Sequence, residues 1–286
     1  MDKDTPEVIP DIPRRKPVLG LPAAAVTGHW YANKRFHSRM GDALSLLFPE
    51  GERFFVESVR YFQGQIEDPT LKKAVADFVA QEAAHGRAHR AFNQALGEGG
   101  LPMAQELEGE LRAVLDFVRR IFGPKSQLAV TCALEHFTAL MAEQLMREPE
   151  HREAMAPEVR PLWLWHALEE SEHKSVAFDV YRAVGGGYWR RVSIMILTTL
   201  MFFTMTSRFQ RRLIRHEGPL SWAEILEGVD HIWGRKGMMR RLIPDYLAYF
   251  RPKFHPTDHD SSALIAWCRA YLYGPGGALA GLWEAA

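Results

Sequence analysis

The sequence of 286 residues contains only two cysteines, Cys132 and Cys268, and they fit no CxxC or zinc-ribbon spacing. A secreted scaffold held together by disulfides needs many more. The sequence also lacks an excess of charge, because 35 Lys and Arg balance 35 Asp and Glu. Without a positive excess, the composition does not favour nucleic acid as a partner. We therefore expect a cytoplasmic protein that binds no nucleic acid.

Long apolar runs are scarce as well. Residues 1–15 hold no apolar stretch, so no secretory signal peptide is expected. The one long uncharged segment, residues 192–206, lies between arginines and falls short of the roughly 20 residues that a membrane span needs. A helix buried in the protein is the favoured interpretation, while a membrane span and contact with a membrane surface stay open.

The pattern that is present is helical. Strand signals are few, and apolar residues recur at steps of three and four. We expect core helices from Pro49 through residue 62 and over residues 70–96, 125–146 and 158–183, with a connecting helix over 107–122. This order is typical of an all-α, ferritin-like four-helix bundle with a crossover helix.

The remaining segments flank this bundle. We expect an extended lead over residues 1–25, the bundle over 26–215, and additional C-terminal helices over 216–286 that pack on it as an appendage. The appendage is expected to be interrupted at Pro244 and by residues 250–260, which are rich in proline and histidine.

Acidic and histidine side chains occupy core-facing positions in all four predicted bundle helices. Each stripe is otherwise apolar, and a purely structural helix would have Leu or Val at these places. The set comprises Glu52 in the first helix, Glu82 and His85 in the second, Glu135 in the third, and His166, Glu170 and His173 in the fourth.

Charge explains why such a set points to metal. A bare carboxylate buried in an apolar bundle is costly unless it is protonated or neutralised. Two divalent cations would neutralise the four glutamates and leave the imidazoles to complete the ligand shells. Two glutamates plus two Glu-x-x-His pairs on four helices is also the ligand set of di-iron and di-manganese bundles. We therefore predict two bound metal ions, with iron favoured and manganese or zinc as alternatives.

Several neighbours of these residues have competing interpretations. His89 could be a ligand, but a hydrogen bond to a ligand or a place in the core is favoured, so it is predicted to support the site from outside. Glu169 competes with Glu170, which alone forms the i, i+3 pair with His173. Glu169 is therefore the second candidate for a supporting role.

Other acidic and histidine residues are predicted to lie outside the site. Glu57 and Glu143 fall off their apolar stripes, so both are interpreted as exposed helix charges. Glu172 points away from His166 and is expected at the surface or behind the ligands. His255 and His259 could form a second metal site or contact substrate, but a proline-fixed turn packed on the bundle is favoured.

Four motifs carry a resemblance to a known family. WHALEESEHKSVAFD, QEAAHGRAH, FPEGERFF and RPKFHPTDHD resemble a bacterial family labelled "predicted metal-dependent hydrolase", and this similarity covers most of the chain. The ligand pattern alone is also similar to that of the di-iron arylamine N-oxygenases. That second resemblance implies that His166 is an extra ligand beyond the common six.

Two enzymatic functions follow from these patterns. The leading hypothesis is a non-haem di-iron enzyme that uses O₂ and an electron donor to oxidise a small apolar, aromatic or lipid-like substrate. In it His85 binds one iron, and His166 and His173 bind the other. The alternative is a di-metal hydrolase in which a metal-bound hydroxide attacks an ester, amide or phosphoester. Metal storage is less favoured, and the formation of a homodimer stays open.

Overall fold

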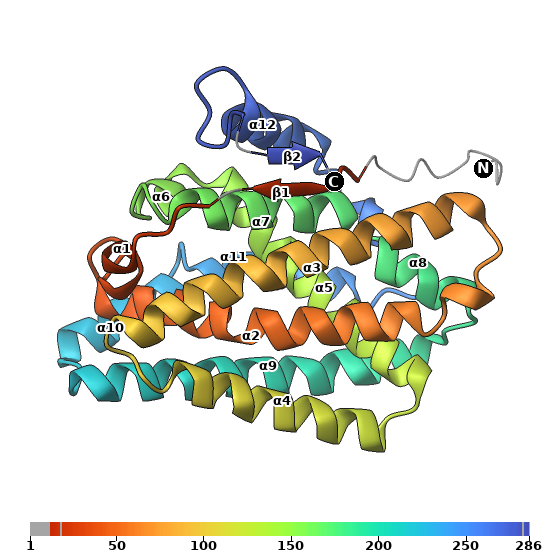
Figure 1. Cartoon of the computed structure of the whole chain (residues 1–286). Helices are drawn as coiled ribbons and strands as arrows, with labels where there is room; N and C mark the ends of the chain where they lie inside the picture. Colours follow the sequence, from red (N-terminus) through yellow and green to blue (C-terminus); the bar gives the residue numbers. More distant parts are fainter. Residues whose placement is uncertain (1–11, 18, 282, 286) are drawn as a thin grey trace.

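The computed structural model describes residues 12–17, 19–281 and 283–285. In this part of the chain, twelve α-helices and one pair of short strands form the fold, which confirms the predicted all-α bundle (Figure 1). The elements are β1 (Arg15–Pro17), α1 (Ala23–Thr27), α2 (Arg35–Arg60), α3 (Pro69–Glu98), α4 (Ala104–Ile121), α5 (Pro124–Arg147), α6 (Pro149–Glu153), α7 (Arg160–His173), α8 (Val176–Ala183), α9 (Tyr188–Glu217), α10 (Trp222–Trp233), α11 (Met238–Ala248), α12 (Ser262–Tyr273) and β2 (Trp283–Ala285).

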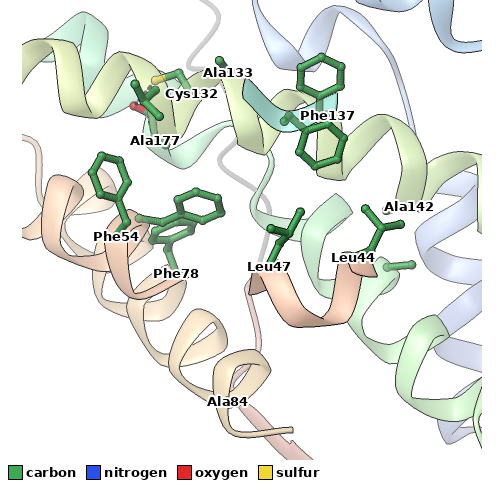
Figure 2. Packing of buried hydrophobic residues seen from close by; sticks show 14 of the residues in the cluster. Leu44, Leu47, Phe54, Phe78, Ala84, Cys132, Ala133, Phe137, Ala142 and Ala177 are labelled. Carbon is green, nitrogen blue, oxygen red and sulfur yellow. Dashed lines mark hydrogen bonds between the residues drawn. The ribbon is translucent and has the colours of Figure 1, made fainter. Parts of the chain in front are cut away.

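The central bundle consists of α2, α3, α5 and the α7–α8 pair, and α4 is the predicted connection between α3 and α5. Helix α3 begins where the sequence indicates, because the Asp68 carboxylate accepts a hydrogen bond from the Thr70 backbone N–H at 2.9 Å and Pro69 occupies the first turn. Figure 2 shows side chains from four of these helices meeting in the core, among them Phe54, Phe78 and Ala177.

The first core helix is longer than predicted. Helix α2 runs over 26 residues and contains Pro49 in its interior, whereas the sequence favoured a start at Pro49. A proline removes the hydrogen bond to the carbonyl four residues earlier, here that of Ser45. The Asn93 side-chain amide of α3 donates to this carbonyl at 3.1 Å. Because a tertiary contact replaces the missing bond, the helix continues through the proline.

The fourth core helix is divided. The predicted helix over residues 158–183 ends as α7 at His173 and resumes as α8 at Val176. The backbone of Lys174 and Ser175 stays in the right-handed helical region, so the helix is distorted rather than redirected. At this break the Lys174 side chain points away from the bundle core, and its ammonium donates to the His259 carbonyl at 2.6 Å.

Helix α9 changes the interpretation of the uncharged segment. It spans 30 residues and packs along α2 and α5, but only 44% of its most apolar 18-residue window is buried. It is long and apolar enough to cross a membrane by length and composition. The favoured interpretation of a buried helix therefore holds for one side of α9 only, since the other side is open to solvent.

The C-terminal helices follow the predicted order with one difference. Pro244 lies inside α11 and does not interrupt it. Both Pro244 and Arg240, whose carbonyl loses its helical partner, are exposed, so water can bond this carbonyl. Helix α12 packs on α7, and the proposed division at residues 25 and 215 stays a prediction.

Strands β1 and β2, from opposite parts of the chain, lie together beside α7 (Figure 1). Strand β1 pairs antiparallel with β2, with Arg15 opposite Ala285. The predicted extended lead thus contains a strand and the beginning of α1, while residues 1–11 and 18 lie outside the described part. This strand pair holds Arg15 against the bundle.

Candidate metal centre

Six of the seven predicted ligands form two compact groups inside the bundle. The ligand atoms within each group all lie within 4.8 Å of one another, and every residue is buried. The seventh residue, Glu135, has its carboxylate 3.6 Å from Nε2 of His173. The structure therefore brings the side chains of four helices to one place. The two groups are Glu52, His85 and His166, and Glu82, Glu170 and His173.

The grouping of the histidines differs from the prediction. The rings of His85 and His166 stack with their centroids 4.3 Å apart, whereas the sequence paired His166 with His173. Seven residues along a helix correspond to about 10 Å, so His166 and His173 lie two turns apart. His85 projects from α3 at the level of His166.

Glu170 lies between the two groups. Its Oε1 is 3.0 Å from Nε2 of His166, 3.5 Å from Nδ1 of His85 and 3.6 Å from Nε2 of His173. Glu169 points elsewhere, with one carboxylate oxygen 3.0 Å from Arg15 and the other 3.1 Å from Nε2 of His85. This geometry favours Glu170 as the ligand and Glu169 as a residue that orients His85.

An outer partner fixes the tautomer of two of the histidines. Nε2–H of His85 donates to Glu169, which leaves Nδ1 for the site. Nδ1–H of His173 donates to Oε1 of Gln81 at 2.8 Å, which leaves Nε2. Gln81 is itself oriented, because its amide nitrogen donates to the Pro13 carbonyl at 2.9 Å. Such hydrogen bonds from outside are typical of metal-binding histidines.

A longer chain of hydrogen bonds orients His166. Because the Asn93 amide donates to the Ser45 carbonyl and to Glu108, its Oδ1 accepts from the Ser45 hydroxyl at 2.7 Å. The Ser45 oxygen can then accept from Nδ1–H of His89, 2.9 Å away. Nε2 of His89 accepts in turn from Nδ1–H of His166 at 2.7 Å. The lone pair of His166 Nε2 is thereby left for the site.

The pKa values show how strongly these charges interact. Burial, followed by the negative charge of Glu82, raises the pKa of Glu52 well above its usual range. Burial lowers the pKa of His85, but hydrogen bonds to Glu169 and Glu170 outweigh burial and raise it to about 10. Burial and the neighbouring His85 lower the pKa of His166 to about 4. Without metal, the cluster would have to take up protons to limit its buried charge.

Unpartnered atoms test whether the residues fit a metal. Seven of the eight carboxylate oxygens of Glu52, Glu82, Glu135 and Glu170 lack a hydrogen-bond partner of acceptable geometry among the described residues. The site-facing nitrogens of His85 and His173 lack one too. Nearly all buried polar atoms in proteins are hydrogen-bonded. A convergent set of orphaned oxygen and imidazole nitrogen atoms is the donor set of di-iron and related divalent-metal bundles, so the residues fit two such ions.

The sequence missed most of the outer partners. Arg15 is buried and donates to both Glu169 and Glu172. Glu172 is enclosed, which agrees with the second of its two predicted places, behind the ligands. Glu143 is also buried, which contradicts its interpretation as an exposed charge, because Lys174 reaches its carboxylate at 2.9 Å. Glu57 is exposed as predicted. An arginine in a proline-rich lead gave no periodic signal that could have revealed its role.

The two histidines of the C-terminal turn pack on the bundle. Nε2 of His255 lies 2.8 Å from the Asp179 carboxylate, and its backbone N–H is capped by Asp258. Nε2 of His259 lies 2.9 Å from Glu143. Neither belongs to the metal groups found among the described residues, which agrees with the favoured interpretation of a packed turn.

An apolar pocket of about 60 Å³ adjoins the centre. Helices α2, α4, α5 and α9 line it, and among the described residues Glu52 is the one charged side chain in its lining. A second apolar pocket of about 60 Å³ shares Phe48 and Thr138 with the first and reaches His166 and Glu170. Apolar space therefore borders both metal groups.

Removing His89 tests the orienting chain. We expect His89→Ala to weaken metal binding by about 10- to 100-fold, the usual effect of losing an outer partner, because His166 would no longer be held in one tautomer. Competition with a fluorescent chelator measures this affinity. His136→Ala is the control, since His136 is also buried but its Nε2 lies 3.3 Å from the Asp245 carbonyl, away from the centre. Equal affinity in both variants would contradict the role of His89.

Comparison with protein-family models places the chain in a known family. The model of a family described as "predicted metal-dependent hydrolase" matches residues 13–260, which include the candidate ligands and their outer partners. Searches of curated proteins and of solved structures gave no match.

Proposed function

Because the chain belongs to the family of predicted metal-dependent hydrolases, we propose that it cleaves an ester or amide bond in a substrate with an apolar chain, using two divalent metal ions. The observation that carries this proposal is the position of Glu52, which belongs to a metal group and also borders the apolar pocket. A bond placed at the end of the pocket would lie beside the centre.

The ions would be held by Glu52, Glu82, His85, Glu135, His166, Glu170 and His173. Bound there, they would supply Lewis-acid activation of water and of the substrate carbonyl. Glu52 is the acidic residue that faces the pocket. It is therefore positioned to accept the proton that the attacking water loses. The same carboxyl can return this proton to the leaving oxygen or nitrogen when the bond breaks.

The pocket limits the substrate. Its volume of about 60 Å³ is well below the roughly 150 Å³ of an engineered cavity that holds benzene, so a narrow alkyl chain suits it better than a ring. The residues that line the two apolar pockets include no Lys or Arg in the described part of the chain. A charged phosphoester would be left without a cation there. We therefore favour a carboxylic ester or amide.

Oxidation by O₂ at the same centre is a second candidate. The family description does not support this reaction, although the ligand pattern suggested it. One observation favours it, because a carboxylate-rich centre beside a pocket with little polar surface suits the oxidation of an apolar group. Iron in particular is not implied by the family match.

The experiment combines metal analysis with two assays. The purified protein is loaded with Zn²⁺, Mn²⁺ or Fe²⁺ and tested on acyl esters of increasing chain length. We expect hydrolysis that disappears with a chelator and has its highest kcat/KM at an intermediate chain length. Leu115→Phe, which narrows the pocket, should shift this optimum to shorter chains and leave the metal content unchanged.

A different outcome of these assays would favour oxidation over hydrolysis. If every loaded form failed to hydrolyse the esters and matching amides, and the reduced iron form gained new absorption on mixing with O₂, oxidation would replace hydrolysis as the proposed function.

A further inference from the structure

Helix α9 exposes an unusual side to solvent. Trp189 is 80% exposed and Leu200 is 67% exposed, and no charged residue occurs between Arg191 and Arg208. The opposite side is fixed to the bundle, where Gln210 donates to the Phe36 carbonyl at 2.9 Å. An α9 fixed in this way cannot cross a bilayer, but its open side can lie on one.

Helix α10 continues the exposed apolar surface. Trp222 and Leu226 are 79% and 67% exposed, and Val229 and Trp233 follow at helical steps on the same side. The other side of α10 packs closely, because a Cβ on Gly228 would lie 2.5 Å from the Phe36 ring. The helix is thus amphipathic with its large apolar side chains outward.

The helices that carry these side chains are neighbours. Trp233 of α10 lies beside Phe203 of α9, with ring centroids 6.1 Å apart. Tyr246 of α11 and Thr199 of α9 share a hydrogen bond of 2.9 Å between their hydroxyls. Of the fifteen exposed large hydrophobic residues in the described chain, ten belong to α9, α10 and α11. We call these ten side chains the docking face; they are Trp189, Ile196, Leu197 and Leu200 of α9, Trp222, Leu226, Val229 and Trp233 of α10, and Ile243 and Leu247 of α11.

Charge identifies what the docking face would bind. Residues 188–251 contain eleven Lys and Arg but five Asp and Glu, although the whole chain is balanced. Some of these arginines pair with acids elsewhere, but Arg211, Arg215, Arg235, Lys236 and Arg240 are exposed. Tryptophan and basic side chains around an apolar surface are typical of an interfacial helix on anionic lipid. A second copy would bring two positive faces together.

We propose that the docking face lies on the surface of an anionic lipid bilayer and that the substrate is a lipid-like ester or amide taken from it. The second part rests on the proposed function. Met201, Phe202 and Met205 of α9 line the pocket that reaches Glu52. Helix α9 therefore carries part of the docking face and also borders the pocket, so an acyl chain would pass from the bilayer alongside α9 to the centre.

Vesicle flotation with the metal-loaded full chain tests the docking. We expect binding to vesicles of phosphatidylcholine with phosphatidylglycerol, and binding weaker by about tenfold or more to phosphatidylcholine alone or at high salt. Leu200→Glu and Leu226→Glu should each reduce binding to the anionic vesicles by about tenfold or more. Tyr271→Glu is the matched control, because Tyr271 is 39% exposed and belongs to α12, a helix that lies across the bundle from α9 (Figure 1).

Each outcome separates docking from catalysis, because flotation needs no turnover. Failure to bind anionic vesicles, equal binding to both vesicle types, or equal loss in the Tyr271→Glu control would overturn the docking. So would a dimer in solution that Leu200→Glu dissociates while vesicle binding is unchanged. Vesicle binding without hydrolysis of an ester or amide would support the membrane docking and contradict the proposed function. If the protein both binds vesicles and hydrolyses esters or amides, the lipid substrate predicts faster hydrolysis of a substrate held in vesicles than of a soluble one. Leu200→Glu should abolish this difference in rate.

Discussion

Replacing Glu170 with glutamine is expected to remove at least one of the two metal ions and with it the hydrolytic activity. Glu170 lies within 3.6 Å of the site-facing nitrogens of all three candidate histidine ligands. Glutamine keeps its shape but not its negative charge, so the balance between four carboxylates and two divalent ions is lost. Since the loss of an outer partner alone costs about 10- to 100-fold in affinity, the loss of a central ligand should cost more.

Metal content by plasma mass spectrometry and chelator competition measure this effect. His173→Ala and Glu135→Ala are expected to lose metal in the same way. Glu143→Gln is the matched control, because Glu143 is a buried glutamate of α5 that contacts Lys174 and His259 outside the centre. It should retain both ions, as should Glu143→Ala. Two tightly bound ions in all three ligand variants would show that the centre has been misplaced.

The core-facing positions of the candidate ligands were predictable because each follows from local periodicity. An acidic or histidine residue on an otherwise apolar helical stripe must face the core, and four such stripes in one bundle must meet. Nothing beyond the sequence of each helix was required for Glu52, Glu82 or Glu135. The distances between the helices decide the rest, including the pairing of His85 with His166.

His89 and Glu169 were predicted as supporting residues because they share a helix with candidate ligands, but most other outer partners come from distant segments and were not predictable. Arg15 and Glu169 are separated by 154 residues, and the contact depends on the pairing of the two chain ends. Pro49 illustrates the same point within the bundle. Local rules end a helix before a proline, but Asn93 satisfies the carbonyl that Pro49 leaves free. The Asn93 side chain also orients His89 and His166 through the Ser45 hydroxyl. The residue that lets α2 continue through Pro49 therefore also supports the metal centre.

The uncharged helix shows a different limit. Hydropathy along residues 192–206 cannot distinguish a buried helix from one that is half exposed, because both contain the same residues. The distinction depends on the absence, in the described chain, of an element over the outer side of α9, where Leu200 and Trp189 are exposed. Only the packed structure contains this information.

Replacing Glu135 with methionine is expected to change stability in opposite directions with and without metal. Both Glu135 oxygens are buried and lack a hydrogen-bond partner in the described structure, and burial, then the charge of Glu170, raises the pKa of this carboxyl well above its usual range. In the metal-free protein, methionine removes this unfavourable group, and an unsatisfied buried polar group costs about 1–3 kcal/mol. The metal-free variant should therefore melt several degrees above metal-free wild type.

With metal the order should reverse. A ligand at about 1,000 times its Kd adds about 4 kcal/mol of stability, and for a domain of 150–250 residues each kcal/mol raises Tm by about 2–4 °C. Wild type should thus gain about 10 °C on metal loading, while Glu135→Met should gain little because its centre is incomplete. Scanning calorimetry of both proteins, with metal and with a chelator, gives the four values of Tm. If the variant melts below wild type both with and without metal, Glu135 stabilises the fold itself. If the variant has the higher Tm without metal and the lower Tm with metal, wild type gives up stability of the metal-free fold for metal binding.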